Sequence, residues 1–540
     1  MSYPRKLHVL IIEDDPGPID GYTDMLSNAR DAFPSIEPTI VRSYADAQSM
    51  LQSPRIFHCL ILDLNLPLAN RQQPAEGLAP GEQLLELAAQ RDDYPVPVLL
   101  VISGKLETAS FTDLQAKLSQ SFWYGVLIGK KNPKLEDELR TGLYKTHEYL
   151  DVGIHLRDSG NRWFPTLAPR EEDLLRRCIL EKPGRLGVDL EWWSAEHGPS
   201  LSHPTANDGP TKVLMGRFLL DDGMEFSRPT FFKFEPSGNA SYVCRDVTIL
   251  DHKLSHVKVQ HSASSKSRSL LVTQSVTDSR PVSLDSMLMP TMTVDDTLLP
   301  LLVEDIVGQL GKLGDTSENE IPVPELLWKY HNVDNLKATY RPPSGLSSSV
   351  PSPIAVFEEL VSSTVRVWAT KRACIHGDLN ATNVAVDIGG DGRPRAYIFD
   401  AAGIHADVDT RDLAVLEVTT LLFSNDGDLH AQFSAFEHFY SGKLNPGPLA
   451  TLTSLPTSVR RTAILIAAIR QQVEKCKNHE TYPIVLFDTA LLQLGGLVVQ
   501  PKRNKICQPQ EASALAAWIA TWLKRSKPSL FPASSPVQPK

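Results

Sequence analysis

The sequence has few cysteines, and they are not grouped. Among 540 residues there are six cysteines, with no CxxC pair and no spacing typical of a metal site. This excludes a small disulfide-stapled scaffold, and scattered free thiols lead us to expect a cytoplasmic protein in a reducing environment. The six are Cys59, Cys178, Cys244, Cys374, Cys476 and Cys507.

Long apolar runs and an excess of positive charge are also missing. No segment approaches the roughly 18 apolar residues of a membrane span, and AILIAAI (463–469) is typical of a buried helix. The start, MSYPRKLHVLIIEDDP, has no small-residue cleavage site, which predicts a strand instead of a signal peptide. A net charge of −10 and the lack of a basic recognition helix argue against nucleic acid. We therefore expect neither membrane insertion nor a nucleic-acid partner.

What is present indicates a globular chain whose first segment is built on parallel strands. With 42% hydrophobic and 22% charged residues, the chain can fold as about two to four domains. Apolar runs separated by helical patterns are typical of a doubly wound, five-stranded parallel sheet covered on both faces. These runs are LHVLII (7–12), EPTIV (37–41), HCLILDL (58–64), VPVLLVIS (96–103) and YGVLIGK (124–130).

Polar residues occur where these runs end. Glu13 and Asp14 follow the first, Asp63 lies in the third, and Ser103 and Lys130 end the fourth and fifth. The carboxyl ends of parallel strands form the ligand crevice of a doubly wound sheet. Carboxylates that converge there repel one another unless a hard cation such as Mg²⁺ lies among them. The pattern predicts a Mg²⁺ site beside a carboxylate, Asp63, that accepts a phosphoryl group.

The stretches VLIIEDDP, LILDLNLP, VLLVISG and IGKK make residues 1 to about 145 similar to the receiver domain of two-component response regulators. The resemblance implies that Asp63 is the phosphorylation site of a phosphorelay and is phosphorylated by a sensor histidine kinase. It also implies that Glu13, Asp14 and Asp63 bind the metal. Ser103 is then the switch hydroxyl, and Lys130 contacts the phosphate.

The segment departs from the receiver pattern at three points. Lys131 stands where a proline usually follows the lysine, and Leu127 stands at the usual aromatic switch position. The loop after Asp63 is long, with the sequence LPLANRQQPAEGLAPGEQ. These departures concern the conformational relay more than the phosphorylation chemistry.

A second β-rich region follows a connector. Residues 167–184 are expected to form a helix that ends at Pro183 and Gly184, and GVDLEWWS (187–194) is expected to form a strand. TKVLMGRFLL and RPTFFKFE read as two strands of a hairpin, followed by a helix over 239–256 and a strand over 269–276. A lysine inside such a sheet, Lys233, is suited to hold nucleotide phosphates with a carboxylate of the following helix as its partner. The candidate partners are Asp246 and Asp251.

The segment IHGDLNATNVAVD (375–387) reads as strand, tight turn and strand. Phosphoryl transfer from ATP needs a carboxylate to take the acceptor's proton, and Asp378 is suited to this role. Asn383 and Asp400, which ends a further apolar run, are suited to bind Mg²⁺. His376 is expected to brace the loop by hydrogen bonding. The alternative is an ordinary polar turn with capping Asp and Asn residues.

Residues from about 205 to 525 resemble the protein-kinase-like superfamily, nearest to its aminoglycoside phosphotransferase and choline kinase branch, because the turn is His-Gly-Asp. The resemblance implies an α+β bilobal fold and an ATP- and Mg²⁺-dependent kinase acting on an alcohol group. By this resemblance Lys233 anchors the phosphates, Asp378 is the catalytic base, and Asn383 and Asp400 are metal ligands.

Further features of this region bear on the acceptor and on catalysis. Asn380 stands where protein kinases carry a lysine, which favours a small-molecule acceptor over a protein. TRDLAVLEVTTLLF (410–423) resembles the helix that follows the metal-binding aspartate, with Asp412 bracing the catalytic loop. No Gly-rich phosphate loop is recognisable, and the helix partner of Lys233 is an Asp where Glu is usual. These two departures motivate an alternative.

Together these patterns predict a two-component signalling protein whose phosphorylated receiver regulates a phosphotransferase. The alternative is a response regulator with a pseudokinase-like output module that binds nucleotide or a protein partner without catalysis. The expected domains are a receiver at 1–148, a helical and loop connector at 149–204, a phosphotransferase domain at 205–525 and a disordered tail at 526–540.

Overall fold

The chain forms two compact units, each described by itself. Unit 1 contains Met1–Glu191, Leu214–Ala240 and His261–Val272, and unit 2 contains the rest. The structure is a computed structural model that describes residues 6–28, 35–66, 80–104, 108–156, 167–181, 184–192, 212–220, 229–236, 258–264, 268–274, 281–327, 333–342, 350–389, 391–398, 405–423, 440, 456–477, 479–499 and 509–531.

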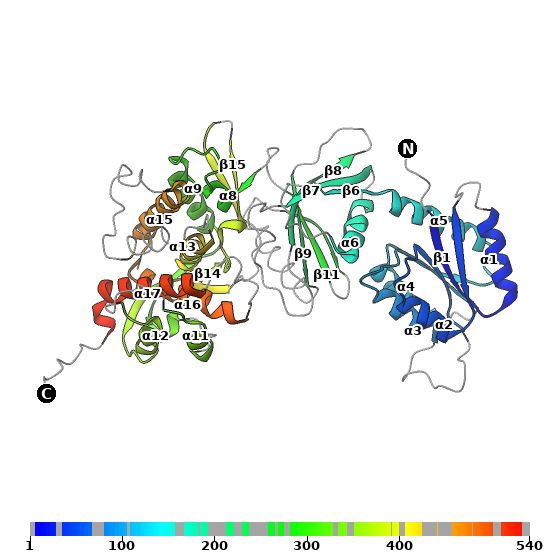
Figure 1. Ribbon diagram of the computed structural model, residues 1–540, viewed down its shortest axis with the longest axis horizontal. Coiled ribbons are helices and arrows are strands. Elements are labelled where there is room, and N and C mark those ends of the chain that lie inside the picture. The colour runs from blue at the N-terminus through cyan, green and yellow to red at the C-terminus, as the bar shows by residue number, and fades with distance from the viewer. Residues whose placement is uncertain are drawn as a thin grey trace. The chain divides into compact units, whose positions relative to one another are not determined.

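Unit 1 begins with a five-stranded parallel sheet of order β2-β1-β3-β4-β5. This order fits a receiver-like, doubly wound fold, as the sequence predicted. Each strand coincides with one of the five apolar runs (Figure 1). Their bounds are β1 Leu7–Ile12, β2 Ile36–Val41, β3 Cys59–Asp63, β4 Val98–Ser103 and β5 Tyr124–Gly129.

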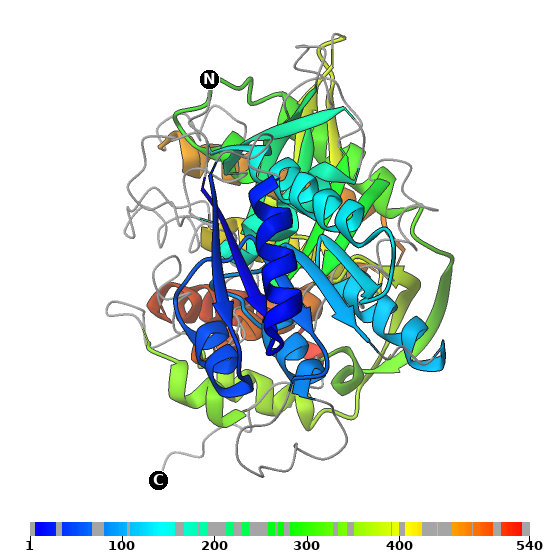
Figure 2. The same cartoon turned by 90° about the vertical axis from the view of Figure 1, so that its right-hand side faces the viewer.

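Both faces of this sheet are buried, which explains the nearly continuous apolar strands. Along β1, Leu10 and Ile12 pack with α2, α3 and α4, whereas Val9 and Ile11 pack with α1 and α5. In Figure 2 the dark-blue helix α1 lies in front of the sheet and covers that face. The helices are α1 Pro16–Asn28, α2 Tyr44–Gln52, α3 Pro80–Ala89, α4 Thr108–Ser121 and α5 Leu135–Asp151.

A second sheet has six strands in the order β10-β11-β9-β8-β7-β6. Strands β6 and β7 are parallel, and α6 (Pro169–Leu180) connects them in sequence. The strands are β6 Gly153–Leu156, β7 Arg185–Trp192, β8 Lys212–Leu220, β9 Thr230–Pro236, β10 Lys258–Ser264 and β11 Arg268–Gln274.

The second sheet includes residues that the sequence assigned to a connector. Residues 149–204 were expected to form a connector with a helix over 167–184 and a strand over 187–194, and α6 and β7 lie at those places. Strand β6 was not expected, and β6 and β7 belong to the same sheet as β8 and β9. Four-residue β6 (GIHL) is too short for its alternation of apolar and polar residues to indicate a strand by itself. The loop DDGMEFS (221–227) expected between the two hairpin strands and the helix expected over 239–256 lie outside the described residues.

Unit 2 packs helices and two small antiparallel sheets around one apolar core. One sheet has the order β12-β15-β16 and the other β13-β14-β17. These strands are β12 Val282–Ser283, β13 Thr316–Pro322, β14 Arg366–Ile375, β15 Val384–Ile388, β16 Pro394–Ile398 and β17 His405–Val408. The helices are α8 Leu284–Leu288, α9 Leu298–Leu310, α10 Val323–Leu326, α11 Val333–Thr339, α12 Pro353–Val361, α13 Arg411–Phe423, α15 Thr457–Lys475, α16 Tyr482–Val499 and α17 Pro509–Ser526, with 3₁₀ turns η2 Ala381–Asn383, η4 His479–Thr481 and η6 Pro528–Leu530.

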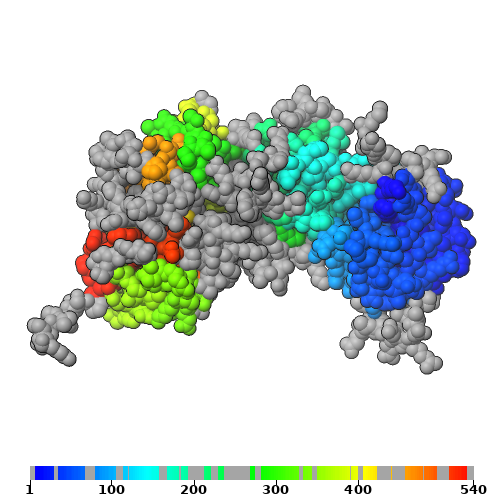
Figure 3. All heavy atoms as spheres, in the orientation of Figure 1, coloured from blue at the N-terminus to red at the C-terminus, as the bar shows by residue number. Residues whose placement is uncertain are grey.

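The end of the described chain packs on this core, although residues from 526 onward were expected to form a disordered tail. Helix α17, red in Figure 3, reaches Ser526. The turn η6 follows, and Leu530 is 5% exposed within the core. The ammonium of Lys524 lies 4.9 Å from the ring centroid of Phe531. Phe531 also packs against the apolar core, so the packed chain extends to residue 531. Among the described helices, none is long and apolar enough to cross a membrane.

Candidate functional site

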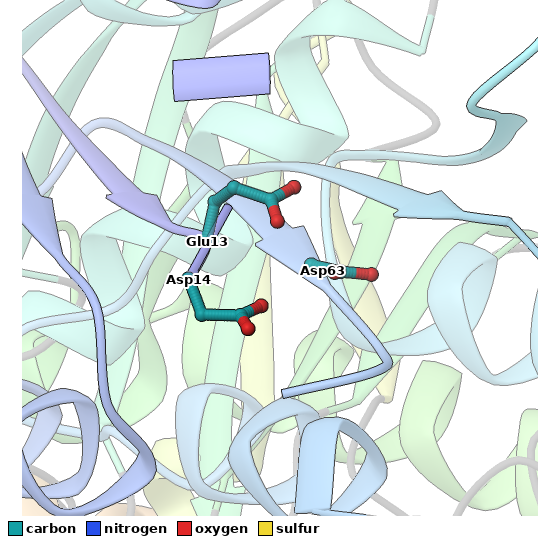
Figure 4. A group of neighbouring side chains, drawn as sticks. All are labelled: Glu13, Asp14 and Asp63. Atoms are coloured by element: carbon teal, nitrogen blue, oxygen red, sulfur yellow. The ribbon is translucent and has the colours of Figure 1, made fainter. Parts of the chain in front are cut away.

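The acidic residues predicted at the strand ends of the first sheet lie together. Glu13 and Asp14 directly follow β1, and Asp63 is the last residue of the neighbouring strand β3. One oxygen from each carboxylate lies within 4.8 Å of the other two. Figure 4 shows the three side chains pointing to the same side of the strand ends. Parallel pairing of β1 with β3 thus brings together residues about 50 positions apart in sequence.

Lys130, the residue after β5, reaches two of these carboxylates. Its Nζ lies 2.8 Å from Asp63 Oδ2 and 3.0 Å from Glu13 Oε2. Burial alone lowers the pKa of Lys130, but its hydrogen bonds to Asp63 and Glu13 outweigh burial and raise that pKa. Burial raises the pKa of Glu13, and the charge of Asp63 adds to this effect. The pocket thus holds more negative charge than Lys130 neutralises.

The arrangement suits a hard divalent cation. Glu13 is 1% exposed, and its Oε2 lies 3.0 Å from the ammonium of Lys130, which also pairs with Asp63. Three carboxylates thus share one ammonium, and buried negative charge that is not fully paired is costly unless a further cation binds. Mg²⁺ prefers carboxylate oxygens together with its own waters. The residues present therefore fit Mg²⁺ bound by Glu13, Asp14 and Asp63.

Ser103 completes the predicted set on this edge of the sheet. It is the last residue of β4, 2% exposed, and its Oγ lies 3.5 Å from Asn65 Nδ2. The backbone N–H of Asn65 donates to Asp63 Oδ1 at 3.1 Å. Asn65 thus links the candidate phosphorylation site to the candidate switch hydroxyl. Sequence reasoning missed it, although its position two residues after Asp63 is a common place for an Asx-type contact.

The second candidate site is the loop that joins β14 to β15 in unit 2. Asp412, in the first turn of α13, accepts the backbone N–H of His376 through Oδ2 and that of Gly377 through Oδ1, both at 2.8 Å. Gly377 has φ 83°, a left-handed conformation that glycine adopts without strain. Asp412 is 2% exposed. The loop is therefore fixed at its start by one buried carboxylate, the bracing geometry predicted for Asp412.

Within the loop, short polar contacts orient Asp378 and Asn383. Asn383 is 4% exposed, and its Nδ2 donates to the backbone oxygen of Asp378 at 2.8 Å. Asn380 Oδ1 accepts the backbone N–H groups of Thr382 and Asn383, which starts the η2 turn. These contacts hold Asn383 beside Asp378, with the Nδ2 end of the Asn383 amide turned toward the loop backbone.

His376 has the location expected of a bracing residue. Its side chain is fully buried, and Nδ1 accepts the backbone N–H of Asp378 at 3.3 Å. Asp378 is half-buried, and its Oδ1 lies 3.4 Å from Asn380 Nδ2. A proton acceptor for a substrate must be accessible, which applies to Asp378 and not to His376. The predicted metal ligand Asp400 lies outside the described residues.

Lys233 lies on β9 of unit 1, in the sheet where a nucleotide-binding lysine was predicted. Its Nζ is 3.1 Å from Glu235 Oε2, on the same strand, and the two residues are 8% and 3% exposed. Asp246 and Asp251, the predicted partners, lie outside the described residues. Sequence reasoning missed Glu235. The period of two in a β-strand, which places residues 233 and 235 on one face, was the signal that could have found it.

The chain shows low similarity to several solved structures. No protein-family model matches the chain, and no curated protein matches it in sequence. A response regulator receiver protein from Sinorhizobium medicae is 19% identical with a TM-score of 0.20, covering 26% of this chain and 94% of that one. A putative aminoglycoside phosphotransferase from Ralstonia eutropha is 12% identical with a TM-score of 0.31, covering 59% and 94%. Plasmodium vivax ethanolamine kinase is 12% identical with a TM-score of 0.30, covering 78% and 94%. Because every TM-score is below 0.5, we base the function on the residues of the two sites.

Proposed function

We propose that this chain is a two-component signalling protein in which a receiver, phosphorylated on Asp63, regulates an ATP- and Mg²⁺-dependent phosphotransferase. The observation that carries the catalytic part is the loop at residues 376–383. Asp412 holds its backbone, and the loop holds Asn383 against the accessible Asp378. A turn that only reverses the chain direction needs no buried carboxylate to fix it and no such pair of oxygen ligands.

In the proposed reaction, a hydroxyl of a small-molecule acceptor attacks the γ-phosphorus of ATP, and the bond to the β-phosphate oxygen breaks to release ADP. Asp378 takes the proton of the attacking hydroxyl. Asn383, with Asp400, would hold Mg²⁺, which neutralises charge on the phosphates when bound. Lys233 would hold the phosphate oxygens, and His376 keeps the backbone of Asp378 in place.

The receiver would work as a switch, and a sensor histidine kinase would set the phosphorylation state of Asp63. A phosphoryl group would move from the histidine of that kinase to Asp63, and Lys130 and Ser103 would contact its oxygens. Glu13 and Asp14 would share the metal with Asp63. This part is supported by the geometry of the five residues at one edge of the sheet.

Regulation is supported by α6, which contacts the receiver-like part through charged side chains. The guanidinium of Arg170 donates to the backbone oxygens of Ala89 and Arg91. Asp173 accepts the hydroxyl of Tyr149 of α5 at 2.9 Å. Arg170 and Asp173 are 3% and 0% exposed. These contacts bind α6 firmly to α5 and to the end of α3.

The same helix also contacts the six-stranded sheet. Glu171 of α6 forms a buried ion pair with Arg268 of β11, and β11 pairs with β9, which carries Lys233. A movement of α5 on phosphorylation would therefore pass through α6 to the sheet that holds the candidate phosphate-binding lysine. We take this chain of contacts as the proposed regulatory route.

The test is turnover of ATP by the full chain with pooled small-molecule alcohols, before and after treatment with acetyl phosphate as a donor for Asp63. We expect acceptor-dependent ADP release that Asp378→Asn abolishes while circular dichroism stays unchanged. Asp63→Asn should retain basal turnover and lose the response to acetyl phosphate. ATP binding by calorimetry without turnover of any acceptor would instead support the pseudokinase-like module. Turnover that survives Asp378→Asn would contradict the catalytic assignment.

A further inference from the structure

Two oppositely charged side chains share one face of β9. Successive side chains of a strand point to opposite faces, so Lys233 and Glu235 lie on the same face, separated by one residue. Their charged groups are 3.1 Å apart, and both residues are buried, at 8% and 3% exposed. The ammonium is therefore held along the strand toward Glu235.

The other face of β9 carries two fully buried phenylalanines. Phe232 and Phe234 are fully buried there, and the ring of Phe232 meets that of Phe218 of β8 edge-to-face at 5.5 Å between centroids. Arg185 of β7 lies over Phe218 at 3.4 Å from the ring centroid. Core packing of β9 is thus provided by the phenylalanines. Neither Lys233 nor Glu235 is on the face that makes these ring contacts.

A buried ion pair contributes little to the free energy of unfolding. Removing two charges from water costs several kcal/mol, and apolar residues of similar volume are commonly as stabilising or more so. What the pair does achieve is to hold the ammonium of Lys233 in one orientation inside a desolvated site. An anchor for phosphate oxygens needs that fixed orientation before a nucleotide arrives.

We propose that Glu235, on the same strand, is a positioning residue for Lys233. The inference rests on the proposed function, because it concerns the nucleotide phosphates that Lys233 would bind. Glu235 acts through Lys233 and does not touch the nucleotide. It orients the ammonium toward the phosphates of a nucleoside triphosphate.

The experiment measures binding of MgATP and of adenosine to the full chain by calorimetry, for the wild type, Glu235→Gln, Glu235→Asp, Lys233→Met and the double variant. Adenosine lacks phosphates, so the ratio of the two dissociation constants isolates phosphate anchoring from damage to the sheet. Glu171→Gln is the matched control, because it removes the same charge from another buried ion pair that involves this sheet.

We expect Glu235→Gln to weaken MgATP binding by about tenfold or more, the loss typical of one misdirected hydrogen bond to a charged group, and to leave adenosine binding within about twofold. Glu235→Asp should restore part of the loss. In the Lys233→Met background, Glu235→Gln should change MgATP binding no further, because its action passes through the lysine. Glu171→Gln should leave the ratio unchanged.

Each other result overturns a specific statement. Equal weakening of MgATP and adenosine, or an unchanged MgATP affinity, would show that Glu235 has only a structural role. Additive losses in the double variant would show that it does not act through Lys233. If Glu235→Gln does not fold, the Asp variant and the uncharged double variant carry the same comparison. A wild-type chain that binds neither ligand would overturn the proposed function as well, which separates that failure from the others.

Discussion

Replacing Asp412 with alanine should free the candidate catalytic loop. The change removes the acceptor of two backbone N–H groups, those of His376 and Gly377. His376 is fully buried, so its N–H would lose its partner at a cost of about 1–3 kcal/mol, whereas Gly377 is half-buried and water can replace part of its bond. We therefore expect Asp412→Ala to lower the free energy of unfolding by about 2–4 kcal/mol.

The effect has a local signature that general destabilisation lacks. Hydrogen exchange of the amides of residues 376 and 377 should accelerate more than exchange in the core of α15 or α16, and ATP turnover should fall with it. Glu474→Ala is the control, because this exposed carboxylate of α15 should change stability by less than about 0.5 kcal/mol. Urea denaturation provides the global value.

One outcome would refute the reasoning directly. If the amides of residues 376 and 377 exchange in Asp412→Ala as slowly as in the wild type, Asp412 does not hold the loop. A large loss of global stability without that local change would place the role of Asp412 in the packing of α13. Asp412→Asn offers a finer test, because its amide group can accept one N–H but presents donors to the other.

Three further predictions concern charge. Because burial raises the pKa of Glu13, its ionised form costs stability at neutral pH, and this cost disappears as pH falls through the raised pKa. Mg²⁺ should therefore raise the melting temperature more at pH 7 than at pH 5, and EDTA or Glu13→Gln should remove the difference. Burial, opposed by the charge of Arg372, raises the pKa of Asp409 to about 6. The stability of the wild type should therefore fall as pH rises through about 6, whereas that of Asp409→Asn should not. Melting temperatures between pH 5 and 8 provide the measurement. Glu171→Gln should leave basal turnover unchanged and abolish its response to acetyl phosphate; an intact response would exclude the route through Arg268.

The strands of the first sheet could be predicted because buried parallel strands have an unambiguous pattern. LHVLII and VLLVIS are apolar at every position or nearly so, and both became strands with two buried faces. The acidic cluster followed from the rule that parallel strands end at one edge. By contrast, β6 is four residues long, and β10 contains KVQHSAS, which is mostly polar. Neither has enough period-2 signal to be recognised without its neighbours in the sheet.

The contacts of charged side chains could not be predicted in the same way. The sequence PREEDLLRRCIL of α6 indicates a helix, and its charges are of the kind that usually face solvent. In the structure Arg170, Glu171 and Asp173 are each at most 3% exposed because each has a partner far away in sequence or on the next turn. Pairing of this kind depends on which elements pack together, and periodicity carries no information about it. The segment 239–256, expected to form a helix, and Asp400 lie outside the described residues, so the predictions for them stay predictions.

The position of α6 also limits how a signal can travel. A flexible tether would let the receiver-like part and the six-stranded sheet move independently, and phosphorylation would then act only through a new binding surface. Here Arg177 of α6 donates to the backbone oxygen of Ser121 at 2.9 Å and pairs with Asp173, so that α6 is held to the receiver-like part by donors and acceptors that are nearly all buried. Breaking one of them leaves a charge unpaired in a desolvated site, which costs about 3–5 kcal/mol. In the proposed route, small shifts of α5 are therefore less costly to transmit through α6 than to absorb within it, and the ion pair of Glu171 with Arg268 would pass them to β11, which pairs with the strand of Lys233 and Glu235.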